Sequence, residues 1–161
     1  MMRRTAFRMA PPSQSGVGLI EVMVAVLVLS IGFLGMAALQ ARSLSMNNSA
    51  MARSVATMAS YSILDAMRAD LVSAQSGAYN GTVKANACPT ATGTLADSQL
   101  FQWCSQQLAP GLGASASTTG TINCTGSQGV CTVTVTYDDS KSESATADTS
   151  GTQTVITQAM L

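Results

Sequence analysis

Histidine is absent from this 161-residue chain, and charged residues make up only 10% of it. Without histidine the chain has no Ser-His-Asp or Cys-His catalytic group and lacks the commonest metal ligand. Lysine and arginine together number 8, as do aspartate and glutamate. This balance argues against binding to nucleic acid, which requires a basic patch. The composition therefore disfavours an enzyme, predicts no cofactor, and suits one ordinary domain.

Charge is almost missing from a long segment near the N-terminus. Between Gly16 and Leu39 the only ionisable side chain is Glu21, and no proline interrupts residues 17–39. As an α-helix this segment would extend about 34 Å, enough to cross a hydrocarbon core of about 30 Å. Three arginines precede the segment, and only Arg42 follows it closely. We therefore expect the N-terminus in the cytoplasm and the residues after about 42 outside.

Several kinds of membrane signal begin with a basic leader and an apolar helix. A removable secretory signal has an apolar region of about 7–15 residues followed by an A-x-A-like site, whereas this region is longer and lacks that site. The pair Arg3-Arg4 also permits a twin-arginine signal, although paired arginines are common in basic leaders. A plain membrane anchor explains every feature except Glu21, because an unpaired carboxylate in lipid is costly.

The segment at 16–21, GVGLIE, follows a short basic leader and resembles the processing site of type IV prepilins. The resemblance implies that a prepilin peptidase cuts between Gly16 and Val17, and that Val17 is then N-methylated. Glu21 becomes the fifth mature residue, where the family keeps its glutamate. The family more often begins with Phe and continues with Ser or Thr, positions held here by Val17 and Gly18. Removal of 16 residues would leave 145, with 5 basic and 8 acidic side chains and a net charge of −3.

A second stretch narrows the resemblance to the PilV minor pilins. Residues 30–42, SIGFLGMAALQAR, are similar to their SIGxLGxxxLQ stretch, and residues 66–70, AMRAD, resemble the end of their helix. The resemblance covers about residues 14–70. It implies an α+β pilin fold, in which a long N-terminal helix, transmembrane in its first half, packs on a C-terminal antiparallel β-sheet.

The same resemblance implies a role in starting pilus assembly. The expected partners are prepilin peptidase, the major pilin, other minor pilins and a tip adhesin. The chain would sit in the inner membrane before assembly and in the cell-surface pilus afterwards. A pseudopilin of the type II secretion system shares the processing signal and is the alternative. A membrane-tethered enzyme or ligand-binding module is a third, disfavoured hypothesis.

Glu21 needs a cation once apolar helices pack around it, because a buried unpaired charge is costly. The amine that cleavage creates on Val17 is the obvious candidate, on the same chain or on a neighbour. We expect this pair to set the axial register of subunits, although Glu21 could also be a bystander near an interface. Gly32 and Gly35 permit either close helix packing or a local loosening of the helix.

The chain divides into a leader at 1–16, a membrane or filament-core helix half at 17–41, an amphipathic half at 42–72, and an exported head at 73–161. We expect one continuous helix over about 18–72, ended by Ser76-Gly77. One apolar stripe of its second half is assigned to the sheet: Ile63, Leu64, Met67 and Leu71. A second stripe on nearly the opposite face is assigned to neighbouring subunits: Leu44, Met51, Val55 and Met58. A gentle bend of the helix, or chance in the sequence, is the alternative explanation for the change of face.

The head contains two clear strand patterns. Residues 131–137 alternate apolar and polar side chains, and residues 152–160 form the second predicted strand. Between 77 and 130 we expect loops with short strands, or one short helix at about 95–108. Trp103 is expected to pack in the core, and Asp138-Asp139 to lie in a solvated turn.

All four cysteines lie on the expected exported side, where disulfides form: Cys88, Cys104, Cys124 and Cys131. Three pairings are possible. We favour Cys88–Cys104 and Cys124–Cys131, because neighbours in sequence close at low cost. A zinc site is disfavoured, since the spacing lacks C-x-x-C and the chain lacks histidine.

Overall fold

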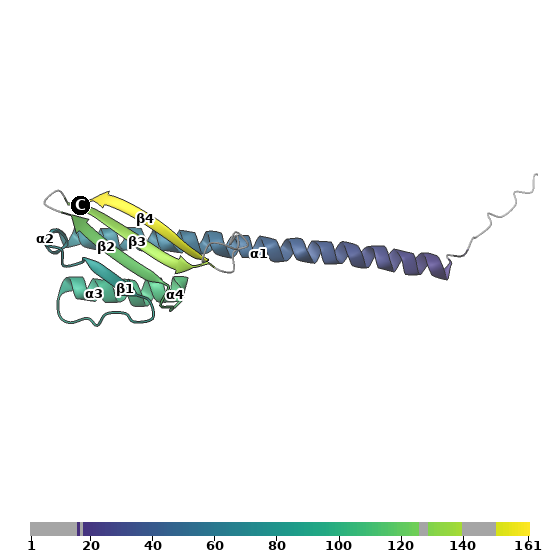
Figure 1. Cartoon of the computed structure of the whole chain (residues 1–161), viewed down its shortest axis with the longest axis horizontal. Coiled ribbons are helices and arrows are strands. Elements are labelled where there is room, and N and C mark those ends of the chain that lie inside the picture. The colour runs from purple at the N-terminus through teal and green to yellow at the C-terminus, as the bar shows by residue number, and fades with distance from the viewer. Residues whose placement is uncertain (1–15, 17, 126–128, 140–150) are drawn as a thin grey trace, which may run out of the picture. The chain divides into compact units, whose positions relative to one another are not determined.

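The computed structural model describes residues 16, 18–125, 129–139 and 151–161. It contains two compact units, Met1–Gln40 and Ala41–Leu161. Helix α1 (Leu19–Ala69) supplies its first half to one unit and its second half to the other (Figure 1). The second unit also contains all four strands and every other helix that the structure describes.

Helix α1 begins immediately after Gly18. The Gly18 carbonyl accepts hydrogen bonds from the N–H of Glu21 at 2.9 Å and of Val22 at 3.3 Å. The next 51 residues contain no proline and stay helical to Ala69. Gly32 and Gly35 do not break the helix, since each costs only about 1 kcal/mol relative to alanine.

The C-terminal end of α1 differs from the expectation of one helix to about residue 72. The helix ends at Ala69, and a short helix α2 (Leu71–Gln75) follows after Asp70. Asp70 is non-helical, with φ −126° and ψ 58°, and its carboxylate accepts bonds from Ser73 Oγ at 2.8 Å and Tyr79 Oη at 3.1 Å. These side-chain bonds compete with helical geometry. The turn expected at 76–77 is present, with Gly77 at φ +84°.

Four antiparallel strands form one sheet in the order β1-β2-β3-β4. The strands are β1 (Gly81–Lys84), β2 (Thr119–Thr125), β3 (Val130–Asp138) and β4 (Thr152–Met160). The two predicted strands are confirmed, since β4 has the predicted bounds and β3 extends one residue beyond them at each end. Long helix and antiparallel sheet together confirm the predicted α+β pilin-like arrangement.

The helical segment after residue 94 is longer than predicted. Helix α3 (Leu95–Gln102) continues as a π-helical turn (Trp103–Leu108) and then as α4 (Ala109–Leu112). Thr94 caps its start by accepting the Asp97 N–H at 3.0 Å. Hydrogen bonds from Thr94 and then Thr92 lower the pKa of the Asp97 carboxyl. Helix α4 ends at Leu112, so the predicted end at residue 108 is wrong by four residues.

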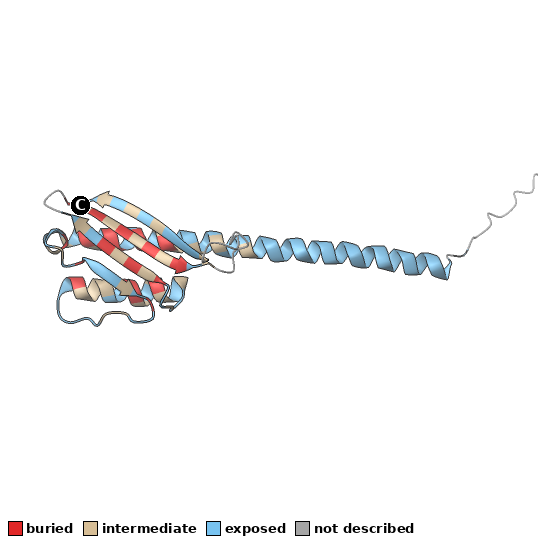
Figure 2. Cartoon of the chain, in the orientation of Figure 1, coloured by how far each residue is buried: buried red, intermediate tan, exposed pale blue. Residues whose placement is uncertain are grey.

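The core of the second unit lies between the sheet and the helices, as the burial pattern in Figure 2 shows. From α1 the side chains of Ile63, Leu64 and Met67 are buried. This confirms the stripe assigned to the sheet, except at Leu71, which is 39% exposed. Leu71 follows the break at Asp70 and therefore leaves the face that α1 presents to the core.

Trp103 lies in this core, as predicted. Its side chain is 2% exposed, and its Nε1–H donates to the carbonyl of Ala59 at 2.9 Å. The indole therefore joins the π turn to α1. Buried tryptophan usually finds such an acceptor for its N–H.

Candidate functional site

The candidate processing and assembly site lies at the start of α1. Gly16 is exposed and outside any helix or strand, whereas Val17 falls outside the described residues. Glu21 lies in the first turn of α1, where the positive end of the helix dipole favours a carboxylate. Gly16 is thus exposed, and the acid lies in the first turn of the helix that follows.

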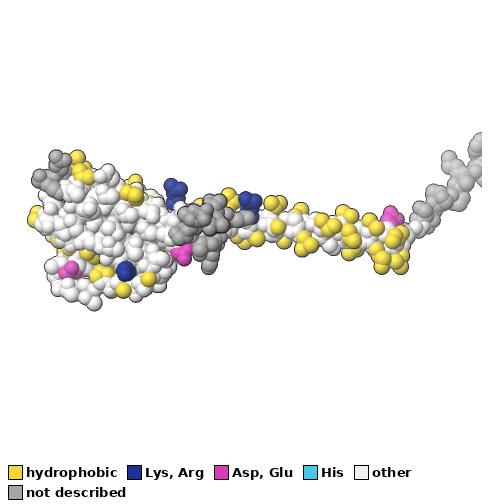
Figure 3. Space-filling view, in the orientation of Figure 1, with side chains coloured by type: hydrophobic (Ala, Val, Ile, Leu, Met, Phe, Trp, Pro, Cys, Tyr) yellow, Lys and Arg dark blue, Asp and Glu magenta, His cyan; other side chains and the backbone are white. Residues whose placement is uncertain are grey.

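The first half of α1 is an apolar surface without a core of its own. Every described residue from 18 to 40 is exposed, including Ile31 at 64%, Phe33 at 67% and Leu34 at 72%. Figure 3 shows apolar side chains along this half. Such a surface is not stable in water and requires a bilayer or other helices. By length and composition, α1 can cross a membrane.

Gly32 and Gly35 lie in this apolar half. No atom comes within 4 Å of a Cβ built on either glycine. Contacts within the described residues therefore do not require glycine at either position. Close packing of a neighbouring helix and a local loosening of the helix both stay predictions for these positions.

The two disulfides lie in the head. Cys88 Sγ bonds Cys104 Sγ, and Cys124 Sγ bonds Cys131 Sγ, with sequence separations of 16 and 7. The first ties the loop after β1 to the π turn, and the second joins opposed residues of β2 and β3. This is the pairing that short loop closure favours.

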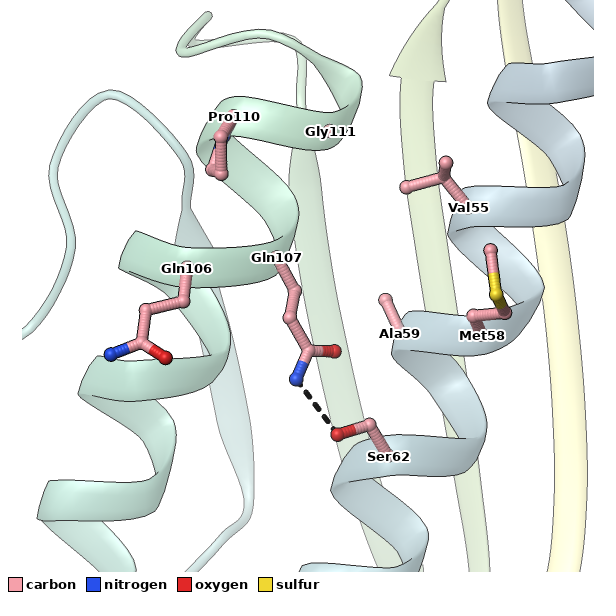
Figure 4. A pocket seen from close by; sticks show the side chains of 8 residues that line it. All are labelled: Val55, Met58, Ala59, Ser62, Gln106, Gln107, Pro110 and Gly111. Atoms are coloured by element: carbon pink, nitrogen blue, oxygen red, sulfur yellow. Dashed lines mark hydrogen bonds between the residues drawn. The ribbon is translucent and has the colours of Figure 1, made fainter.

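A groove of about 490 Å³ lies between α1 and the segment around α4 (Figure 4). It is lined by Val55, Met58, Ala59, Ser62, Gln106, Gln107, Pro110 and Gly111. Gln107 Nε2 donates to Ser62 Oγ across it at 2.7 Å. None of the eight side chains titrates near neutral pH, so the groove presents apolar surface and amides rather than acid–base groups.

The second apolar stripe of α1 is largely uncovered. Leu44, Met51 and Met58 are 64%, 68% and 59% exposed. Val55 is half-buried, and its Cγ1 lies 2.6 Å from a Cβ built on Gly111. Contact of this stripe with neighbouring subunits stays a prediction.

One contact of the head was not expected from the sequence. Ser49 Oγ of α1 donates to the carboxylate of Asp139, 90 residues later. Asp138 is exposed as the last residue of β3, and Asp139 follows it outside any strand and is half-buried. The rest of the predicted turn lies outside the described residues. Burial and then the charge of Asp139 raise the pKa of the Tyr137 phenol, against the opposing charge of Arg53.

Residues 11–37 match the family model of the prokaryotic N-terminal methylation motif. No curated protein and no solved structure matches the chain. The matched region contains the end of the leader, the 16–21 segment and most of the exposed apolar half of α1.

This motif is the signal of type IV pilins and pseudopilins, which are structural proteins. It implies processing by prepilin peptidase and assembly with other pilins. Together with the helix-plus-sheet fold, it supports a pilin-like protein that is anchored in a membrane before assembly.

Proposed function

We propose that the chain is a minor pilin of the type IV pilus that helps to start pilus assembly. The observation that carries this proposal is the methylation motif on a helix half that is exposed at every described position. The apolar surface is accommodated by lipid before assembly and by neighbouring helices afterwards. The head then remains available for contacts with other subunits.

Maturation would follow the resemblance. Prepilin peptidase cuts between Gly16 and Val17, and the new N-terminus on Val17 is methylated. The amine then lies four residues before Glu21, about one helical turn away along the sequence. Their attraction offsets the cost of placing the carboxylate among apolar helices. The pair, within one chain or between two, sets the axial register.

The partners of this minor pilin would be the major pilin, other minor pilins and a tip adhesin. The subunit passes from the inner membrane to the cell-surface pilus. A pseudopilin of the type II secretion system is the second candidate, because it carries the same motif. The SIGFLG stretch at 30–35 and the two disulfides favour the pilus.

Mass spectrometry of the mature N-terminus tests the maturation step. Cells with prepilin peptidase should yield a chain that begins with N-methylated Val17, and cells without it should yield the uncut chain. A chain that begins beyond residue 36, or retains Met1 in the presence of the peptidase, would contradict the proposal. Deletion of the gene separates the two candidates, since loss of pili supports the minor pilin and loss of protein secretion supports the pseudopilin.

A further inference from the structure

One face of the second half of α1 has the spacing of a coiled-coil seam. Five residues form it at alternating intervals of four and three: Leu44, Asn48, Met51, Val55 and Met58. This spacing keeps one narrow stripe of a helix turned toward a second helix along its length. A helix that packs on a globular core usually carries a broader apolar stripe. These five residues are named the seam, and their spacing indicates that another helix covers them.

The seam is largely uncovered and has space beside it. Leu44, Met51 and Met58 are each more than half exposed, and the groove of Figure 4 opens along Val55 and Met58 next to Pro110 and Gly111 of α4. The buried residues of α1 are centred about 130° away from the seam around the helix, at about 100° per residue. A second helix can therefore lie along the seam, beside α4, without displacing the core of the head.

Asn48 is the polar residue of the seam, and it identifies the helix that fits. Its side chain is exposed, and within the described residues its amide makes no hydrogen bond. An unpaired amide is costly in an apolar contact, whereas two facing asparagines satisfy each other, since each has donors and an acceptor. In a parallel pair of identical helices Asn48 faces Asn48, and in an antiparallel pair it would face Leu44, Met51 or Met58. Valine before and leucine or methionine around such an asparagine also favour two strands.

The charges of this part of α1 lie away from the seam. Between residues 41 and 62 the charged side chains are Arg42 and Arg53, and both fall about 180° from the seam around the helix. The positions that flank a coiled-coil seam decide which helices can pair. Here all four are neutral: Ser45, Asn47, Ala52 and Ser54. Two copies of the helix can therefore meet without bringing like charges together.

We propose that two copies of this chain pair through the seam as a parallel, two-fold symmetric dimer before assembly, an inference that rests on the proposed function. The seam is about 21 Å long and a helix is about 10 Å wide, so the contact buries roughly 400 Å² in total. This is well below the roughly 1,200 Å² of a stable free-standing interface. Anchoring of both copies in one membrane raises their local concentration and offsets the small area. A two-fold pair uses the same patch on each copy and does not propagate, so it differs from the contacts that extend a filament.

Single cysteines along α1 test the pair. Each seam residue of a parallel dimer faces its own copy, so Met51→Cys and Met58→Cys should each form a disulfide-linked homodimer, whereas an antiparallel pair would bring at most one of them opposite itself. Met46→Cys is the matched control, because Met46 is 64% exposed and lies about 160° from the seam. Full-length chains are oxidised mildly in the membranes of cells without prepilin peptidase, so that crosslinks within filaments do not contribute. Non-reducing gels give the homodimer, and mass spectrometry of the two native disulfides establishes that each variant is folded.

Met51→Cys and Met58→Cys should each give roughly ten-fold more homodimer than Met46→Cys. In the Met51→Cys chain, Asn48→Lys should lower the homodimer roughly ten-fold, because like charges then face each other, and Ala50→Lys, which lies off the seam, should leave it unchanged.

The proposal is overturned if all three cysteine variants crosslink equally, or if only one of the two seam cysteines links to its own copy. It is also overturned if the seam cysteines link only to a different protein or to none, or if Asn48→Lys has no effect. N-terminal processing is measured in cells that contain the peptidase. Its failure contradicts the proposed function, whereas the crosslinks, which are formed without the peptidase, report on the pair alone.

Discussion

The indole of Trp103 occupies the space that a side chain at position 120 would need. A Cβ on Gly120 would lie 2.2 Å from Trp103 Cη2 and 2.9 Å from Leu108 Cδ1. Glycine at this point of β2 therefore lets the π turn approach the sheet. The same indole reaches the Ala59 carbonyl of α1, so one side chain links the sheet, the π turn and the long helix.

Gly120→Ala should destabilise the head by about 1–3 kcal/mol, because the added methyl forces the indole out of a packed core. Thermal unfolding and tryptophan fluorescence of the full-length protein in detergent measure the effect. Asn123→Ala is the control, since Asn123 lies in the same strand and is exposed. Equal stability of the Gly120→Ala and wild-type proteins would contradict this packing.

Asn80 extends the pairing of β1 with β2 through its side chain. Its Nδ2 donates to the Cys124 carbonyl at 3.2 Å, and its Oδ1 accepts the Cys124 N–H at 2.7 Å. Asn80→Ala should lower the free energy of unfolding by about 1–3 kcal/mol, since two hydrogen bonds are lost. Asn80→Asp keeps only the acceptor and should lie between alanine and wild type in urea unfolding. If Asn80→Ala were more stable than Asn80→Asp, the hydrogen bonds of Asn80 would not account for the stability of this pairing.

Removal of Cys88–Cys104 should cost more stability than removal of Cys124–Cys131. A loop of about 15 residues contributes roughly 3 kcal/mol, and a shorter loop contributes less; the separations here are 16 and 7. The two double-alanine variants are matched controls for each other in denaturant unfolding. If the variant without Cys124–Cys131 were the less stable one, the link between the strands would contribute more to the free energy of unfolding than loop closure does.

Glu21→Ala should reduce incorporation of the subunit into filaments roughly ten-fold, because the proposed pair with the Val17 amine is lost. Immunoblots of sheared filaments against total membrane protein give the ratio. Ser30→Ala is the control in the same helix half, since Ser30 Oγ donates to the Val26 carbonyl one turn earlier, at 2.7 Å. Wild-type incorporation of Glu21→Ala would make Glu21 a bystander.

Alkaline pH should destabilise the head through two buried tyrosines. Burial, followed by the hydrogen bond to Asp70 and its charge, raises the pKa of Tyr79, and burial also raises the pKa of Tyr137. The fold favours the neutral phenol, so this stabilisation is complete below the unfolded pKa of about 10 and is lost as pH rises beyond it.

Thermal unfolding between about pH 8 and 12 measures the alkaline loss. Tyr79→Phe should reduce the slope, at the expense of the hydrogen bonds that Tyr79 makes to Asp70 and Gln99 at neutral pH. An unchanged slope in this variant would show that Tyr79 does not control the alkaline loss.

Local patterns predicted part of the head well. Alternation was sufficient for β3, because that strand has one buried and one less buried face. The bounds of β4 were also predicted, although none of its residues is fully buried. β1 and β2 were not located, since they lie among small polar residues without an equally clear alternation. The helix predicted at about 95–108 continues to Leu112, because the π turn at Trp103–Leu108 leads directly into α4.

By itself, the sequence determined the methylation motif, the apolar helix that follows it and the α+β class. These features depend on residue types at short spacing, which an unfolded chain already contains. Only the tertiary structure decided that Trp103 lies over Gly120, that Ser49 meets Asp139, and that the seam of α1 stays largely uncovered. Contacts between distant segments depend on the path of the whole chain and on which surfaces that path leaves uncovered.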